Sequence, residues 1–183
     1  MRKVYVKERA FLSMVISAVE VYKLETLGLL LGYATKLGNF VVEYAIPYQT
    51  AEHRYTSVVE KATARERMQS ILKSFPIDMI GDFHSHPMFR GSPGKAEPSG
   101  EDIADMHKGL VHMIVAINPA DKNVRWHALK NGRITGTVGD YHLTIGAFAL
   151  VGDYDYECLE VVCPSAVGTN PKWVWEEIHP KEE

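Results

Sequence analysis

The chain has 183 residues, the size of one domain that can bury its own core without disulfide support. Its apolar share of 46% and charged share of 23% are those of an ordinary globular protein, which excludes a disordered chain. The 20 basic and 23 acidic residues give a formal charge of −3 without a basic run, so nothing favours nucleic acid or an anionic membrane as a partner.

The N-terminal part of the chain predicts a strand, a helix and a hairpin. Residues 4–7 are typical of a short edge strand, and apolar residues at helical spacing predict a helix over 8–22. Two apolar segments, 27–33 and 40–48, are separated by a turn-like stretch and predict a β-hairpin. Glu25 lies just before the first of these two strands.

A polar segment and an amphipathic helix come next. Residues 47–55 are expected to form a surface loop, and no spacing makes its His53 a metal ligand. Apolar residues recur through 59–75 with charges between them, which predicts a helix that Pro76 ends.

Residues that commonly bind metals gather around one predicted strand end. An apolar run over 77–80 leads to His84 and His86, and residues two apart on a strand project from one face, so both imidazoles can reach one ion. After a loop with glycine and proline, Ser99 and Asp102 begin a predicted helix. Two histidines and a carboxylate are a recurrent zinc set that leaves a fourth position for water. The combination indicates a catalytic metal site.

Each part of this pattern also has a structural interpretation. A single His-x-His pair is common by chance. Ser99 and Asp102 alone are typical of a helix N-terminus, in which Ser99 caps a helix over 99–108 and the acidic residue completes a capping box. Capping and metal binding are compatible, so both roles stay open for these residues.

The remainder of the chain predicts further strands. Residues 110–117 are strand-like, and 124–129 with 133–138 predict a hairpin around an Asn-Gly turn. The pattern over 141–151 is ambiguous and tilts toward strand. Histidines of this part are interpreted as hydrogen-bonded structural residues: His112, His127 and His142.

The tail and the cysteines bear on domain organisation and compartment. We expect one domain over 1–150 and an extension over 151–183 that packs on it, rather than an aromatic partner surface. Cys158 and Cys163 are interpreted as free thiols. Residues 1–7 lack a signal core and no apolar run approaches the roughly 20 residues that span a bilayer, so we expect a cytoplasmic protein without membrane partners.

The motifs carry a family resemblance. The run His84-Ser85-His86-Pro87, followed by Ser99 and Asp102, resembles the JAMM (MPN+) metalloprotease motif, His-x-His-Pro and then Ser-x-x-Asp. That family also needs a glutamate before a Gly-Leu-x-x-Gly strand, and Glu25 ahead of Gly28-Leu29-Leu30-Leu31-Gly32 is similar. The loop from Pro87 to Ser99 is longer than the family's usual spacing. The order of elements favours an α/β fold with a mixed sheet flanked by helices, and the resemblance implies the cytidine-deaminase-like architecture of MPN domains.

The resemblance implies a reaction and a substrate class. One zinc ion per chain would be bound by His84, His86 and Asp102, and a zinc-bound water would attack an amide carbonyl. Glu25 would be the general base, and Ser99 would donate to the oxyanion. The bond cleaved would follow the C-terminal tail of a ubiquitin-like or sulfur-carrier protein, bound in extended form with the 88–98 loop lining its groove. The identity of that protein, the choice between isopeptide and linear bonds, and the oligomeric state stay open.

Other classes fit the sequence less well. A nucleoside deaminase needs His-x-Glu and Pro-Cys-x-x-Cys elements, which are absent. A metallo-β-lactamase-type hydrolase needs aspartate and histidine where Met88 and Phe89 stand, and an amidohydrolase barrel needs about 250 residues. The remaining rival is a non-catalytic MPN scaffold that binds partners without metal. Such modules typically lack the ligands that this chain has, so the catalytic interpretation is preferred.

Overall fold

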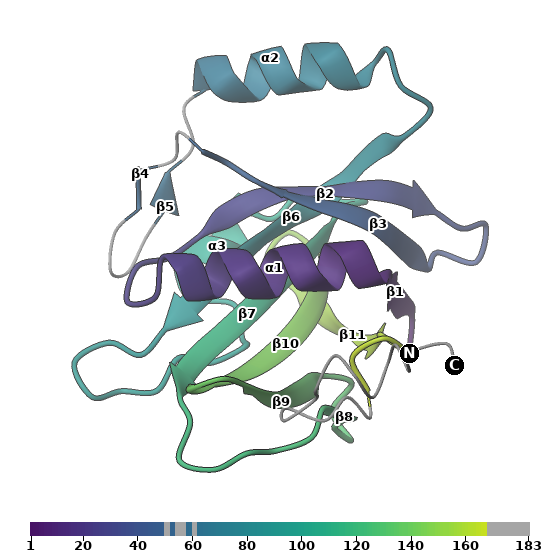
Figure 1. The fold of residues 1–183 in the computed structure, drawn as a ribbon. Coiled ribbons are helices and arrows are strands. Elements are labelled where there is room, and N and C mark those ends of the chain that lie inside the picture. The colour runs from purple at the N-terminus through teal and green to yellow at the C-terminus, as the bar shows by residue number, and fades with distance from the viewer. Residues whose placement is uncertain (50–51, 54–57, 60–61, 168–183) are drawn as a thin grey trace, which may run out of the picture.

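The protein is described by a computed structural model over residues 1–49, 52–53, 58–59 and 62–167. One large mixed sheet has helices on both faces, which confirms the α/β class expected from the sequence (Figure 1). In chain order the elements are β1 (Lys3–Val6), α1 (Glu8–Glu20), β2 (Leu27–Ala34), β3 (Phe40–Pro47), β4 (Glu52–His53), β5 (Val58–Val59), α2 (Ala62–Leu72), β6 (Asp78–Pro87), α3 (Gly100–Asp105), β7 (Val111–Pro119), β8 (His127–Ala128), β9 (Ile134–Val138), β10 (Tyr141–Leu150) and β11 (Tyr156–Val162).

The strand that carries the two histidines lies in the interior of the sheet. The strand order is β11-β1-β3-β2-β6-β7-β10-β9-β8, and β11 also pairs with β10, so the sheet closes on itself. β2 and β3 form the predicted antiparallel hairpin, and β2 pairs antiparallel with β6. β6 then runs parallel to β7. Backbone hydrogen bonds on both sides therefore fix β6.

The main core lies between α1 and one face of the sheet. The buried side chains of α1 recur at helical spacing: Ala10, Phe11, Met14, Val15 and Ala18. The Phe11 ring meets the buried Trp126 ring edge-on, with ring centroids 4.9 Å apart. This contact joins α1 to the segment that leads into β8.

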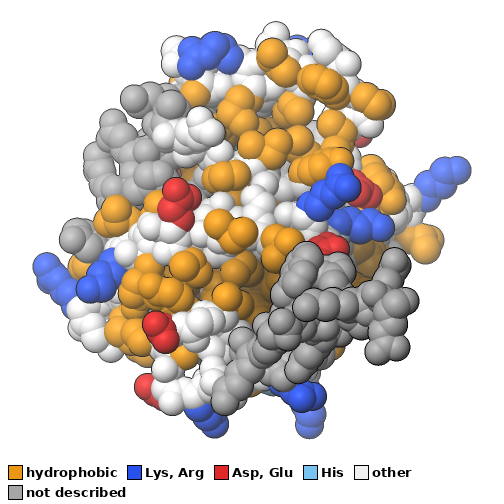
Figure 2. Space-filling view, viewed as in Figure 1, with side chains coloured by type: hydrophobic (Ala, Val, Ile, Leu, Met, Phe, Trp, Pro, Cys, Tyr) orange, Lys and Arg blue, Asp and Glu red, His pale blue; other side chains and the backbone are white. Residues whose placement is uncertain are grey.

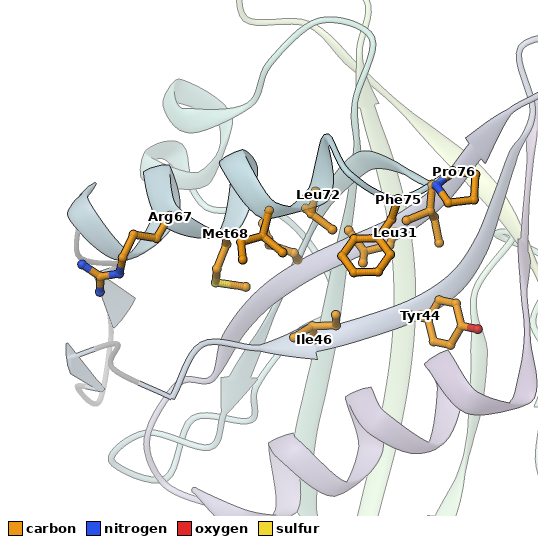
Figure 3. A pocket seen from close by; sticks show the side chains of 11 residues that line it. Leu31, Tyr44, Ile46, Arg67, Met68, Leu72, Phe75 and Pro76 are labelled. Carbon is orange, nitrogen blue, oxygen red and sulfur yellow. The ribbon is translucent and has the colours of Figure 1, made fainter.

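The opposite face of the sheet is covered by α2 and α3. Leu29 and Leu31 of β2 are buried beneath Met68 and Leu72 of α2. Beside this contact lies an open apolar groove of about 820 Å³ between α2 and the β2–β3 hairpin (Figure 3). Figure 2 shows hydrophobic side chains gathered in this region below α2. None of the site residues predicted from the sequence lines the groove.

Two elements of this second face differ from their predicted extents. The helix expected over 59–75 is α2, which spans Ala62–Leu72. Val59, expected to begin that helix, instead pairs with Glu52 of the expected loop. Strands of two residues are too short to leave a period-two signal in the sequence. The helix expected over 99–108 ends at Asp105, because Met106 turns extended and its side chain is buried in the cluster of Ile114 and Phe148.

The strand expected over 124–129 is also shorter in the structure. Only His127–Ala128 pairs with β9, although the hairpin itself is confirmed. Trp126 stands just before this strand and is buried in the main core, while Arg125 and His127 on either side of it are exposed.

Residues beyond position 150 continue the same sheet. β11 pairs in parallel with β1 and antiparallel with β10, and Cys158 and Cys163 are free thiols as predicted. Residues 168–183, which we expect to pack on this domain, lie outside the described residues. None of the helices in the described ranges has the length and apolar character needed to cross a membrane.

Candidate metal centre

The last residues of β6 bring two imidazoles together. His84 and His86 project from one face of the strand because side chains alternate, and their Nε2 atoms lie 3.0 Å apart. His84 is buried, with 8% of its surface exposed. The strand-end geometry predicted from the sequence is therefore present.

Asp102 reaches the same point from the first turn of α3. Its Oδ1 lies 3.2 Å from the His84 Nε2, and its Oδ2 lies 3.3 Å from the His86 Nε2. The predicted capping box is confirmed, since the Ser99 N–H donates to Asp102 Oδ2 at 2.6 Å and the Asp102 N–H donates to Ser99 Oγ at 3.1 Å. One carboxylate thus both starts the helix and faces the two imidazoles.

The spacing of these atoms suits a small cation. Four-coordinate zinc with bonds of about 2.0–2.2 Å holds its ligand atoms roughly 3.3–3.6 Å apart. The two imidazole nitrogens lie 3.0 Å apart, and each lies 3.2 or 3.3 Å from its own oxygen of Asp102, which is close to that range. Among the residues that the structure describes, His84, His86 and Asp102 are the group found to have three ligand atoms gathered in this way.

The electrostatics of the group favour a positive charge at its centre. Burial acts to raise the pKa of Asp102, but hydrogen bonds with His84 and His86 outweigh it and hold that pKa well below its usual range. For His86, burial acts to lower the pKa, and the hydrogen bond and charge of Asp102 more than offset this, so the pKa is raised. The carboxylate is therefore ionised and stabilises cationic neighbours.

Glu25 stands beside this group at the entry to β2. The register of β2 against β6 sets Leu27 opposite His84, so the residue two positions earlier lies near the histidines. Burial raises the pKa of Glu25 to about 7, while the charges of His86 and His84 act to lower it. At neutral pH such a carboxyl is divided between its protonated and ionised forms, which suits a group that must both accept and release a proton.

Ser99 is exposed at the N-terminus of α3. Its Oγ accepts the Asp102 N–H, which leaves the hydroxyl proton able to act as a donor. Capping and donation are compatible, as expected from the sequence.

Three further residues support the centre and were missed from the sequence. Ser85 points away from the histidines, and its Oγ accepts the Thr26 N–H at 2.9 Å. The backbone oxygen of Lys95 accepts a hydrogen bond from His86 Nδ1. The side chain of Asn118 accepts the N–H of Gly94, the residue before Lys95. Strand alternation was a usable signal for Ser85. No sequence signal marks Lys95, because any residue can supply a backbone carbonyl.

The three histidines interpreted as structural, His112, His127 and His142, have hydrogen-bond or ion-pair partners, as predicted. His112 is buried, and its Nδ1 lies 2.9 Å from Asp82 while its Nε2 accepts the His107 N–H at 3.2 Å. His142 Nε2 lies 3.0 Å from the Thr135 hydroxyl. The partner of His127 Nδ1 is the backbone oxygen of Arg125, at 2.9 Å.

Solved structures resemble this fold. The solution structure of a protein from Desulfitobacterium hafniense aligns with a TM-score of 0.59 and 19% identity, covering 87% of this chain and 92% of that one. A solution structure from Salinibacter ruber aligns with a TM-score of 0.48 and 20% identity, covering 85% of this chain and 88% of that one. No curated protein matches the sequence.

The family is decided by a match of the sequence to a family model. Residues 7–129 match the model that describes prokaryotic homologs of the JAB domain. The matched range contains Glu25, both histidines of β6 and the capping box of α3. The chain therefore belongs to the family of prokaryotic homologs of the JAB domain.

Proposed function

We propose that this protein is a zinc-dependent metallopeptidase that hydrolyses a peptide or isopeptide bond after the C-terminal tail of a ubiquitin-like or sulfur-carrier protein. The observation that carries the proposal is the meeting of His84, His86 and Asp102 around one point, with Glu25 half-buried beside them. Membership of the JAB family supports the same chemistry. The proposal includes one zinc ion per chain and the cytidine-deaminase-like architecture that the resemblance implies.

The residues divide into ligands and proton carriers. Nε2 of His84 and of His86, with a carboxylate oxygen of Asp102, would hold the ion, which supplies a Lewis acid and lowers the pKa of water. Glu25 takes a proton from the attacking water and returns it to the departing amine. In the metal-free protein burial raises the pKa of Glu25 to about 7, so this carboxyl holds a proton more readily than an ordinary glutamate does.

The negative charge that develops on the attacked carbonyl oxygen needs a hydrogen-bond donor. Ser99 is the candidate, because its hydroxyl oxygen accepts the Asp102 N–H and its proton is left for the substrate. The short α3 keeps Ser99 and Asp102 in one turn, so the proposed donor and the proposed ligand move together.

The test is a cleavage assay on a panel of small ubiquitin-fold proteins with C-terminal extensions, in linear and isopeptide form. We expect the zinc-loaded protein to cleave at least one of them at the end of its tail. Glu25→Gln should retain zinc and lower the rate by at least about 100-fold. Undiminished cleavage by the variant would remove Glu25 from the mechanism.

The same panel addresses the scaffold alternative. A non-catalytic module would bind a panel protein equally well with and without zinc and would cleave none. If zinc-loaded protein leaves every panel member intact, the peptidase proposal fails for this substrate class.

A further inference from the structure

The ring of His86 is held at both of its nitrogens. Nε2 faces His84 and Asp102, and Nδ1 lies 2.9 Å from the backbone oxygen of Lys95. A carbonyl oxygen can only accept, so Nδ1 carries the proton of this hydrogen bond. In the neutral ring Nε2 then has a free lone pair, which is the form that binds a metal.

Lys95 belongs to an exposed stretch of the 88–98 loop, so its carbonyl needs support to stay in place. That support comes from the preceding residue. The Gly94 N–H donates to Asn118 Oδ1 at 2.7 Å, and Asn118 Nδ2 donates to the Gly94 oxygen at 3.1 Å. Both backbone groups of Gly94 are thus bound by one side chain, which we call the Asn118 clasp.

The clasp needs glycine at position 94. A Cβ atom there would lie 1.9 Å from the backbone oxygen of His86, closer than any real contact. The loop therefore lies directly against the strand end that carries His86. It is anchored again at the buried Ala96, and Glu97 lies 3.1 Å from Arg133.

Asn118 belongs to β7, a strand held by backbone pairing to β6. It lies near the end of β7, where His86 pairs with Ala116 and Pro87 with Ile117 in the parallel β6–β7 ladder. The strand that carries His86 and the strand that carries the clasp are therefore one unit. Asn118 holds Gly94, which positions the neighbouring Lys95 carbonyl, and this carbonyl holds the His86 ring.

We propose that Asn118 is a positioning residue for the metal centre, which acts through Gly94 and the Lys95 carbonyl to hold His86 in its Nδ1–H form with Nε2 toward the ion. The inference deepens the proposed function. The effect on zinc affinity rests on that function, whereas the effect on the His86 ring does not. Groups that orient a ligand histidine commonly contribute 10- to 100-fold in metal affinity. Asn118 is outside the sequence motif, so only the fold connects it to the site.

The test compares Asn118→Leu, whose side chain has the same branching but cannot form hydrogen bonds, with Asn118→Asp, which retains the acceptor for the Gly94 N–H. Asn39→Leu is the matched control, because Asn39 is a half-buried asparagine whose Oδ1 accepts the Lys3 N–H at 2.8 Å in the turn at the far end of the hairpin from Glu25. Zinc dissociation constants are measured by competition with a chromophoric chelator. We expect at least about 10-fold weaker binding in Asn118→Leu, a smaller loss in Asn118→Asp, and no change in the control.

A second measurement does not depend on zinc. Nitrogen chemical shifts of the His86 ring are measured in metal-free protein at a pH high enough to keep the ring neutral, because Asp102 raises the pKa of His86. Assigned with a His86→Ala spectrum, they should indicate the Nδ1–H form in the parent and a mixture in Asn118→Leu. Thermal unfolding in the presence of chelator checks that the variants fold. If Asn118→Leu does not fold, the comparison is made with Asn118→Asp alone.

The outcomes separate the two proposals. A parent protein that binds no zinc overturns the proposed function, while the ring measurement still decides the clasp. Unchanged zinc affinity and an unchanged ring form in both Asn118 variants would overturn the inference alone.

Discussion

Thr26 and Ser85 are joined by two reciprocal hydrogen bonds where β2 meets β6. The Thr26 N–H donates to Ser85 Oγ at 2.9 Å, and the Ser85 N–H donates to the Thr26 oxygen at 3.0 Å. Both residues are buried. Thr26 directly follows Glu25, and Ser85 stands between His84 and His86. The Thr26–Ser85 pair therefore links the proposed base to the two proposed histidine ligands.

Replacing Ser85 by alanine should loosen that connection. The buried Thr26 N–H would lose its partner, so we expect the free energy of unfolding to fall by about 1–2 kcal/mol. Zinc affinity should stay unchanged, while the cleavage rate falls about tenfold because Glu25 is less well placed. Denaturant unfolding and the cleavage assay measure the two effects.

The control is Ser17→Ala, which removes a buried serine of α1 whose hydroxyl donates to the Ser13 oxygen at 2.7 Å. Because the Ser13 oxygen keeps its backbone partner within α1, we expect little change in the free energy of unfolding and no loss of rate per zinc-loaded molecule. Equal rate losses in the two variants would mean that the loss in Ser85→Ala does not come from the placement of Glu25.

Metal analysis of the purified protein should give near one zinc per chain. His84→Ala removes a ligand and should weaken zinc binding by more than about 100-fold, beyond the effect of losing an outer partner. His127→Ala is the control, since His127 is an exposed histidine of β8 whose Nδ1 lies 2.9 Å from the backbone oxygen of Arg125. Full zinc content in His84→Ala would exclude this residue from the site.

The parts of the centre that could be predicted are those set by local rules. Strand alternation puts His84 and His86 on one face, and the capping box orients Asp102 within one turn. Glu25 needed the family motif, because its place depends on how β2 pairs with β6, and pairing is not a local property of either segment.

What the sequence could not predict depends on contacts between distant segments. Asn118 binds Gly94 only because β7 lies beside β6, and no pattern links the two positions. α3 ends earlier than predicted because burial of the Met106 side chain outweighs helix propensity. β11 joins the sheet beside β1, a pairing between the two ends of the described chain that periodicity cannot reveal.

His112 should matter for stability and not for zinc. Its side chain is buried with both ring nitrogens bound, so His112→Leu leaves the Asp82 carboxylate and the His107 N–H without that partner. We expect a loss of about 2–3 kcal/mol in the free energy of unfolding, measured in urea. His107→Ala, an exposed histidine next to the same contact, should change stability by less than about 0.5 kcal/mol. A large loss of zinc affinity in His112→Leu would contradict this assignment.

The pKa of Glu25 predicts how the metal-free protein responds to pH. Because burial raises this pKa from its ordinary 4.5 to about 7, the folded state binds the proton more tightly than the unfolded state. The contribution of Glu25 to stability is therefore full below about pH 4.5 and is lost as pH rises through 7. Glutamine is neutral throughout, so Glu25→Gln removes this loss.

We expect Glu25→Gln to exceed the parent protein in unfolding free energy at pH 8, by about 1 kcal/mol once the partial exposure of the carboxyl is allowed for. Near pH 4.5 the two proteins should be nearly equal. The measurement is urea unfolding at both pH values with a chelator present, because a bound cation would itself favour the ionised carboxylate. A difference that is the same at pH 4.5 and pH 8 would show that Glu25 ionises as readily in the folded chain as in the unfolded one, and it would then lack the pKa that suits a proton carrier at neutral pH.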